Sequence, residues 1–270
     1  MTERGAVLIL GVSSGFGAAA ARAYAAAGWD VLGVHLDRRQ GQAGAAALAD
    51  ALRAEGRRVA FFNRNAADDV ARAEVIAEIG ALLEAWGGKV DVLLHSLAFG
   101  TLRPLAHGAE RPVQRKQLEM TLDVMANSLV YWVADLLAAG HLRQAGAPGG
   151  ADGARIFALT SSGSHTAIPQ YGPVAAAKAA LEVYVRQLAL ELAPLGITAN
   201  ALMAGVTLTP ALEKIPGAAD LIEGARRKNP YRRLTTPDDV ATALVDLSLG
   251  GTRWINGNVI RVDGGEDFCA

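Results

Sequence analysis

A short apolar run that ends in three closely spaced glycines constrains the fold of this chain more than any other feature. Residues 6–10 form a continuous apolar stretch of the kind found in strands buried on both faces of a parallel sheet. Glycines follow at positions 11, 15 and 17, and alanine-rich residues 18–27 are predicted to form a helix that Gly28 ends. This order suits pyrophosphate binding, because glycines allow close backbone approach and the helix N-terminus supplies N–H donors. A tight turn without a ligand has the same pattern, so the motif needs support from the rest of the chain.

Strands and helices are predicted to alternate along the chain. Further strand runs are expected at 30–36, 58–62, 90–94, 155–159, 197–202 and 258–262, with helices at 41–55, 68–86, 112–142, 174–192 and 238–249. Such alternation implies right-handed crossovers and a parallel sheet with helices on both faces. We therefore predict an α/β fold, a single Rossmann-type doubly wound sheet of about seven strands that forms one dinucleotide-binding domain over residues 1–270. Residues 146–153, rich in Gly, Pro and Ala, are expected to be a surface loop of this domain.

The composition restricts the class of protein. With 51% hydrophobic and 20% charged residues, the chain can bury a large core. Its formal net charge of -1 gives no general electrostatic case for binding nucleic acid or an anionic membrane. The single cysteine, Cys269, cannot form a disulfide framework or a cysteine-based metal site, and no other residues mark a metal site. No run approaches 18 consecutive apolar residues and residues 1–5 lack a signal pattern, so we expect a cytoplasmic protein without a transmembrane helix.

An acidic residue follows the second predicted strand, at the position that selects the cofactor in dinucleotide-binding folds. Asp37 lies 20 residues after Gly17, where a carboxylate can hydrogen-bond the adenosine ribose hydroxyls and disfavours the extra phosphate of NADP. Arg38 and Arg39 follow directly and could instead meet that phosphate. We favour NAD(H), because Asp37 is at the strand end, and keep NADP(H) as the alternative.

Other small or polar residues follow the strands at the same edge of the predicted sheet. Asn65 follows the third strand, and His95-Ser96-Leu97-Ala98 follows the fourth. Ligands bind beyond the carboxyl ends of parallel strands, so these residues and the glycine turn are expected to line one cleft. Residues 205–234 show little strand signal and are interrupted by prolines and glycines. An irregular segment of this length beside a cleft is typical of a substrate lid.

A tyrosine and a lysine, Tyr171 and Lys178, are seven positions apart. They fall on nearly the same face of a helix, since two turns take about 7.2 residues. A nearby ammonium favours the phenolate and is expected to lower the pKa of Tyr171, so that its hydroxyl exchanges a proton near neutral pH. Such a pair also occurs on solvated helices, so its interpretation depends on the surrounding motifs.

Taken in order, the motifs resemble those of the short-chain dehydrogenase/reductase family. The resemblance covers nearly the whole chain and rests on Gly11-x3-Gly15-x-Gly17, Asp37, Asp91, the serines before Tyr171 and Lys178, Gly205 with Thr209, and Asp263-Gly264-Gly265. Most members have three residues between the tyrosine and the lysine, but here there are six and Val174 occupies the usual tyrosine position. His95-Ser96-Leu97-Ala98 also replaces the usual Asn-Asn-Ala-Gly. Both departures are similar to the enoyl-acyl-carrier-protein reductases of bacterial fatty-acid synthesis.

Within that branch the chain resembles a divergent, NADPH-using group better than the commonest enzymes. Its glycine spacing is the ordinary one, and Ser161 stands where the commonest enzymes have a second tyrosine. This likeness opposes the preference for NAD(H) that Asp37 indicates, and the sequence leaves both cofactors open.

The resemblance implies a role for each candidate residue. Tyr171 is expected to stabilise the enolate that forms when a hydride from NAD(P)H reaches the β-carbon of a trans-2-enoyl thioester. Lys178 is expected to hold the nicotinamide ribose hydroxyls, and Ser161 to donate a second hydrogen bond, with a structural serine or Ser162 as alternatives. The expected cofactor contacts are Gly11, Ser14, Gly15, Phe16 and Gly17 for pyrophosphate and adenosine, Asn65 and Ala66 for adenine, Ser96, Leu97 and Ala98 for nicotinamide, and Val206, Thr207 and Thr209 for carboxamide and phosphates.

Partners and alternative functions complete the expectations. The basic residues of the lid form either a solvated face or a docking surface for an acidic acyl carrier protein; they are Arg226, Arg227, Lys228, Arg232 and Arg233. Residues 174–192 are apolar almost all round, which suits a buried helix or a subunit contact, and the family resemblance implies a homotetramer. The alternative activity is that of a carbonyl reductase, such as a 3-oxoacyl-thioester reductase, and a third possibility is a nucleotide-binding protein without chemistry.

Overall fold

Seven parallel strands form one sheet in a computed structural model that describes residues 5–108, 110–146 and 152–269. The strand order is β3-β2-β1-β4-β5-β6-β7. The strands are β1 (Ala6–Leu10), β2 (Asp30–His35), β3 (Val59–Asn63), β4 (Val90–His95), β5 (Arg155–Ser161), β6 (Thr198–Ala204) and β7 (Val259–Val262). The order reverses between β1 and β4, and in such sheets a binding crevice opens at that point. The predicted α/β doubly wound sheet is confirmed.

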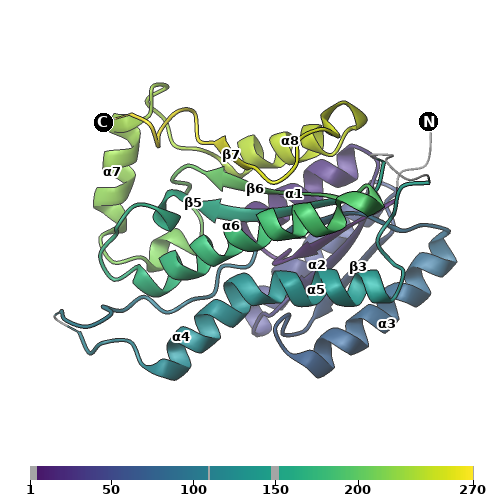
Figure 1. Ribbon diagram of the computed structural model, residues 1–270, viewed down its shortest axis with the longest axis horizontal. Coiled ribbons are helices and arrows are strands. Elements are labelled where there is room, and N and C mark those ends of the chain that lie inside the picture. Colours follow the sequence, from purple (N-terminus) through teal and green to yellow (C-terminus); the bar gives the residue numbers. More distant parts are fainter. Residues whose placement is uncertain (1–4, 109, 147–151, 270) are drawn as a thin grey trace.

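Helices cover both faces of this sheet (Figure 1). They are α1 (Gly15–Ala26), α2 (Arg39–Ala54), α3 (Asp69–Trp86), α4 (Arg115–Leu122), α5 (Ser128–Ala138), α6 (Gly172–Leu192), α7 (Ala218–Lys228) and α8 (Pro237–Leu247). α3, α5 and α6 share a core with one face, and α1, α2 and α8 share a second core with the other. Successive residues of β1 enter the two cores in turn, which is why its sequence is apolar without alternation.

A π-helical turn joins α4 to α5. It spans Asp123–Asn127 and lies in the segment for which the sequence predicts a mostly helical structure over residues 112–142. The Tyr184 hydroxyl of α6 donates to Asn127 Oδ1 at 3.0 Å, so the turn is tied to the helix that carries Lys178. Single π turns are often found beside functional sites.

The lid segment, residues 205–234, has no strand, as its sequence predicts, but part of it is helical rather than irregular. It contains α7 and a 3₁₀ turn at Leu212–Lys214. Asp220 in the first turn of α7 and Arg226, Arg227 and Lys228 in its last turn complement the helix dipole, a signal that the flanking prolines and glycines obscured.

Two other expectations concern the loop at 146–153 and membrane-spanning helices. The predicted loop at 146–153 falls mostly outside the described residues. Over the part of the chain that the structure describes, no helix combines the length and apolar character needed to cross a membrane.

Candidate active site

A cavity of about 390 Å³ lies beyond the carboxyl ends of β4, β5 and β6 and reaches α7. Its wall includes many of the predicted site residues, namely Phe16, Ser96, Leu97, Ala98, Ser161, Tyr171, Lys178, Val206, Thr207 and Thr209. Much of the remaining wall is apolar, with Leu102, Met125, Ile168, Val174, Leu212 and Leu221. An apolar pocket with a few converging polar groups is the usual form of a small-molecule site. The predicted catalytic and nicotinamide-side residues therefore share one cavity.

The glycine turn between β1 and α1 lies beside this cavity. Gly11 has φ +93°, and a Cβ atom there would lie 2.6 Å from the Ser96 carbonyl oxygen. A Cβ atom at Gly17 would lie 2.0 Å from the Gly11 carbonyl oxygen, so close packing of the turn itself requires glycine at both positions. Ser14, the N-cap of α1, makes no side-chain capping bond, so its hydroxyl oxygen does not occupy the first backbone N–H groups of the helix. The turn thus fits an anionic group, and pyrophosphate binding stays a prediction.

Asp37 lies at the carboxyl end of β2, outside the cavity wall. Its carboxylate is 2.8 Å from His35 Nδ1, and its backbone is fixed by Asn63 of β3. Asn63 accepts from the Asp37 N–H at 2.9 Å and donates to its carbonyl at 3.1 Å. Sequence reasoning missed Asn63, because only the pairing of β2 with β3 reveals its role. The side chain of Asp37 is 26% exposed at the edge of the sheet, and its contact with a cofactor stays a prediction.

The two residues expected at adenine lie just beyond β3 and are also outside the cavity wall. Asn65 Oδ1 accepts the Ala67 N–H at 3.1 Å, which closes a local turn. Ala66 is buried, and its carbonyl accepts from Trp132 Nε1 at 2.8 Å. Both residues thus stabilise the local structure, and adenine binding at this edge stays a prediction.

Tyr171, Lys178 and Ser161 converge on the cavity. Tyr171 is the N-cap of α6, and Lys178 follows two turns later on the buried face. The Tyr171 hydroxyl lies 3.4 Å from Ser161 Oγ, while Lys178 Nζ donates to the Leu159 carbonyl at 2.6 Å. Both serines of the predicted pair line the cavity, and the contact with Tyr171 comes from Ser161.

Two backbone features hold Tyr171 in place, and neither was predicted. A Cβ atom at Gly163 would lie 2.5 Å from Tyr171 Cε1, so glycine allows the ring to pack directly on the backbone. Gln170 has φ +62°, a left-handed conformation that is uncommon for a residue other than glycine. The chain therefore accepts backbone strain directly before the candidate catalytic tyrosine.

The pKa values of the pair correct one expectation. Burial raises the pKa of Tyr171, and the hydrogen bond with Ser161 opposes this only in part, so the predicted lowering by Lys178 is wrong. Burial also lowers the pKa of Lys178 to about 8, against a smaller opposing effect of Glu182. At neutral pH Tyr171 is protonated and able to donate a hydrogen bond, and Lys178 on the same cavity wall is mostly charged.

His95, at the end of β4, is fully buried and does not suit acid–base chemistry. Burial, and then the charge of Lys178, lower its pKa to about 3. Its Nε2 lies 2.9 Å from Ser128 Oγ, and that hydroxyl donates to the Val124 carbonyl at 2.8 Å. Because the serine proton is used, His95 Nε2 must be the donor. Neutral His95 therefore ties β4 to the π-helical turn.

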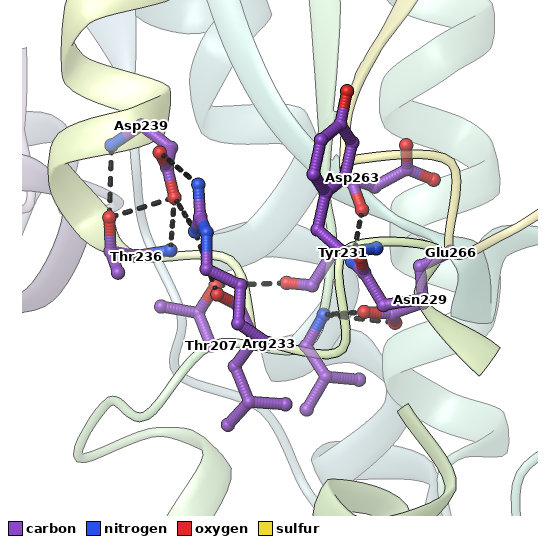
Figure 2. Close-up of polar contacts among 11 residues, drawn as sticks. Thr207, Asn229, Tyr231, Arg233, Thr236, Asp239, Asp263 and Glu266 are labelled. Atoms are coloured by element: carbon purple, nitrogen blue, oxygen red, sulfur yellow. Dashed lines mark hydrogen bonds and ion pairs between the residues drawn. The ribbon is translucent and has the colours of Figure 1, made fainter. Parts of the chain in front are cut away.

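The segment after β6 is held by the C-terminal loop, which is itself tied to Asn229 near the end of the lid (Figure 2). Glu266 accepts the Val206 N–H, and Asn229 donates to the Asp263 carbonyl at 2.8 Å. Glu266 and Lys228 both line the cavity, yet neither was among the predicted site residues. The signal of Glu266 is tertiary, since it lies far from the other wall residues in sequence, whereas Lys228 follows the wall residues Gly224 and Ala225 on α7. No group of three or more His, Cys, Asp or Glu side chains that could hold a metal occurs among the described residues.

Comparisons with known proteins agree with this geometry. The family described as Enoyl-(Acyl carrier protein) reductase matches residues 11–266. A relative from Synechocystis sp., named enoyl-acyl-carrier-protein reductase (NADH), is 31% identical over 73% of this chain and 71% of its own length.

Solved structures extend the likeness over nearly the whole chain. Enoyl-acyl-carrier-protein reductase (NADH) from Aquifex aeolicus has a TM-score of 0.80 and 26% identity, covering 98% of this chain and 96% of its own. A short-chain dehydrogenase from Burkholderia cenocepacia, in complex with NADP, has a TM-score of 0.78 and 28% identity over 97% of each chain. This chain therefore belongs to the enoyl-acyl-carrier-protein reductase family of the short-chain dehydrogenases/reductases, and it is an oxidoreductase in class.

Proposed function

We propose that the protein reduces the carbon–carbon double bond of a trans-2-enoyl thioester with a nicotinamide cofactor, as an enoyl-acyl-carrier-protein reductase of fatty-acid synthesis. The observation that carries the proposal is the single cavity lined by Tyr171, Lys178 and the segment Ser96–Ala98, with a largely apolar wall that suits an acyl chain. The close-packed glycine turn and the uncapped N-terminus of α1 fit the pyrophosphate of that cofactor. Residues 205–234 are proposed to act as the substrate lid of this single domain, in a cytoplasmic enzyme.

The residues of the cavity have distinct roles in this reaction. When bound, the reduced nicotinamide supplies a hydride to the β-carbon of the substrate. Negative charge then develops on the thioester oxygen, and the protonated hydroxyl of Tyr171 donates a hydrogen bond to it. Lys178 holds the ribose hydroxyls and adds positive charge to the cavity. Ser161 orients the Tyr171 hydroxyl.

The reaction is tested by following nicotinamide absorbance with two thioesters of matched chain length. We expect consumption with the trans-2-enoyl thioester and none with the 3-oxoacyl thioester. Consumption with the 3-oxoacyl thioester alone would make the protein a carbonyl reductase that uses Tyr171 as a proton donor to a ketone. Cofactor binding without turnover on either thioester would favour a nucleotide-binding role.

We propose NAD(H) as the preferred cofactor, because Asp37 presents a carboxylate at the end of β2. Replacing Asp37 by Ser is expected to raise the ratio of kcat/KM for NADPH to that for NADH by about tenfold or more, since the repulsion of the 2′-phosphate is removed. Steady-state kinetics with both cofactors measures the ratio. The control is Asp50→Ser on α2, whose carboxylate is 74% exposed and pairs with Arg53. A ratio that stays constant in Asp37→Ser would show that Arg38 and Arg39 decide the preference.

We propose that the end of the lid also receives an acidic acyl carrier protein. Arg226 and Arg227 are exposed in the last turn of α7, whereas Arg233 is engaged by Asp239 through two contacts of 2.6 and 2.9 Å (Figure 2). The double change Arg226→Gln and Arg227→Gln is expected to raise KM for a carrier-linked substrate about fivefold at low salt and to spare a pantetheine thioester. The matched control is Arg53→Gln in the last turn of α2 with Arg57→Gln just beyond that helix. Equal changes in both KM values would argue against docking.

We further propose a homo-oligomer, with a tetramer as the expected state. α6 buries one face in the core, yet Val183 and Leu190 on the same helix are 52% and 70% exposed. Covering such side chains by a second subunit is favourable.

A further inference from the structure

Glu266 is a buried carboxylate on the wall of the active-site cavity. Glu266 lies in the C-terminal loop that follows β7, and it is 8% exposed. Acidic side chains are seldom buried to this extent unless they have partners. The contacts of Glu266 therefore indicate its role.

The C-terminal loop is built to aim Glu266 into the cavity. Asp263 accepts the Gly265 N–H at 2.9 Å with one carboxylate oxygen and the Asp267 N–H at 3.0 Å with the other. Gly264 and Gly265 have φ +62° and +86°, which is the left-handed backbone that this tight turn needs. The turn fixes the backbone on both sides of Glu266, so the direction of its side chain is set by the fold.

The partner of Glu266 is the backbone of the segment after β6. The Val206 N–H donates to Glu266 Oε1 at 3.1 Å and to Oε2 at 3.3 Å. Thr207, which is buried, turns back and donates from its hydroxyl to the Gly205 carbonyl at 3.0 Å. A Cβ atom at Gly205 would lie 2.4 Å from Thr235 Oγ1 and 3.0 Å from Glu266 Oε2. The three residues after β6 are thus fixed by the Thr207–Gly205 bond within the segment and by the bonds from Val206 to Glu266. Glu266 is the partner that lines the cavity.

The charges around Glu266 indicate that this bond is its main stabilising contact. Burial raises the pKa of Glu266, and the Val206 N–H opposes that rise more than Lys228 of α7 does. Asp263 and Asp267 add to the rise, although Asp267 is itself 3.1 Å from His165 and 3.1 Å from Arg261. The Val206 N–H is thus the contact that most favours the carboxylate form of Glu266, and the two bonds to the carboxylate in turn fix the Val206 segment.

We infer that Glu266 is a positioning residue, which fixes Val206 and Thr207 so that they present the nicotinamide end of the cofactor to the substrate. The inference rests on the proposed function, in which Val206 and Thr207 contact the nicotinamide end of the cofactor. It assigns no proton transfer to Glu266, because the carboxylate acts through the Val206 backbone.

The test compares ligands that differ in the nicotinamide group. Glu266→Leu removes the acceptor, and Glu266→Gln keeps one acceptor oxygen of the same reach. In Glu266→Leu we expect the affinity for NADH to fall about tenfold and that for ADP-ribose to stay within about twofold, because only NADH reaches the Val206 segment. Hydrogen exchange of the Val206 amide without ligand is expected to speed up about tenfold or more. Glu266→Gln is expected to remain within about threefold of the wild type in both measurements.

Two further variants keep the test decisive. Glu266→Asp draws the carboxylate back by one methylene and is expected to show the same losses, which covers the case in which Glu266→Leu fails to fold. Asp267→Asn neutralises the neighbouring carboxylate and is expected to leave the ratio of NADH to ADP-ribose affinity unchanged. Equal losses for both ligands, or an unchanged Val206 exchange rate in Glu266→Leu and Glu266→Asp, would overturn the inference. None of these readouts needs an enoyl substrate, so a failure of the proposed reaction is seen separately in the thioester assay.

Discussion

Replacing Tyr171 by Phe is expected to lower kcat for a trans-2-enoyl thioester about 10²- to 10³-fold, while Kd for NADH changes less than about threefold. The hydroxyl is a protonated donor in the cavity, because burial raises its pKa, and its hydrogen bond is needed only when charge develops on the thioester oxygen. An interaction made mainly in the transition state lowers kcat when it is lost, with little effect on ligand binding. Stopped-flow turnover and fluorescence titration with NADH measure the two quantities.

The matched control for this prediction is Tyr184→Phe, which makes the same change on the same helix. The Tyr184 hydroxyl donates to Asn127 at 3.0 Å, and neither of these two residues lines the cavity. It is expected to lower stability by about 1 kcal/mol and to leave kcat within about threefold. Ser161→Ala should cause a smaller loss of kcat than Tyr171→Phe, because the 3.4 Å contact only orients the hydroxyl. A Tyr171→Phe enzyme with full turnover would remove the tyrosine from the mechanism.

The sheet could be predicted from the sequence because its signals are local. Strands buried on both faces must be continuous apolar runs, and residues 6–10 show this directly. Helices between successive strands then leave a parallel arrangement as the simple solution. The same logic places the strand ends at one edge, so the sequence alone predicts that the glycine turn and the segment Ser96–Ala98 share a cleft, and Phe16 of that turn lines the cavity with Ser96, Leu97 and Ala98.

The features that sequence reasoning missed depend on contacts between distant segments. Tyr171 was expected to have a lowered pKa from its spacing to Lys178, but burial is a property of the packed cavity and acts in the opposite direction. Asn63 fixes the backbone of Asp37 only because β2 pairs with β3. Glu266 reaches Val206 only because β7 pairs with β6. Asn63 and Glu266 are ordinary residue types in their own stretches of sequence, and their roles follow from the pairing of the strands.

Replacing Lys178 by Met is expected to reduce kcat/KM for NADH about 100-fold or more, while the protein stays at least as stable below pH 8. Lys178 Nζ donates to the Leu159 carbonyl at 2.6 Å, but its burial lowers the pKa to about 8, so the folded state holds an ammonium at a cost. Methionine fills a similar volume without that cost. For the wild type, kcat/KM should fall as pH rises above about 8, because the free enzyme then loses the charged lysine.

The stability of the wild type should change with pH in the corresponding sense. Between about pH 8 and 10.5 the unfolded chain holds the Lys178 proton and the folded chain does not, so the free energy of unfolding rises with pH. The gain in free energy of unfolding from Lys178→Met should therefore shrink over this window. Below pH 8 that gain is on the order of 3 kcal/mol at most, before the lost hydrogen bond is counted. Urea unfolding of both proteins at several pH values measures the difference. Lys89→Met is the control, since Lys89 Nζ also donates to a carbonyl at 2.6 Å, that of Gly140, but is exposed. A difference between wild type and Lys178→Met that is independent of pH would mean that Lys178 stays charged throughout, and the lysine would then act on the cofactor as a fixed cation.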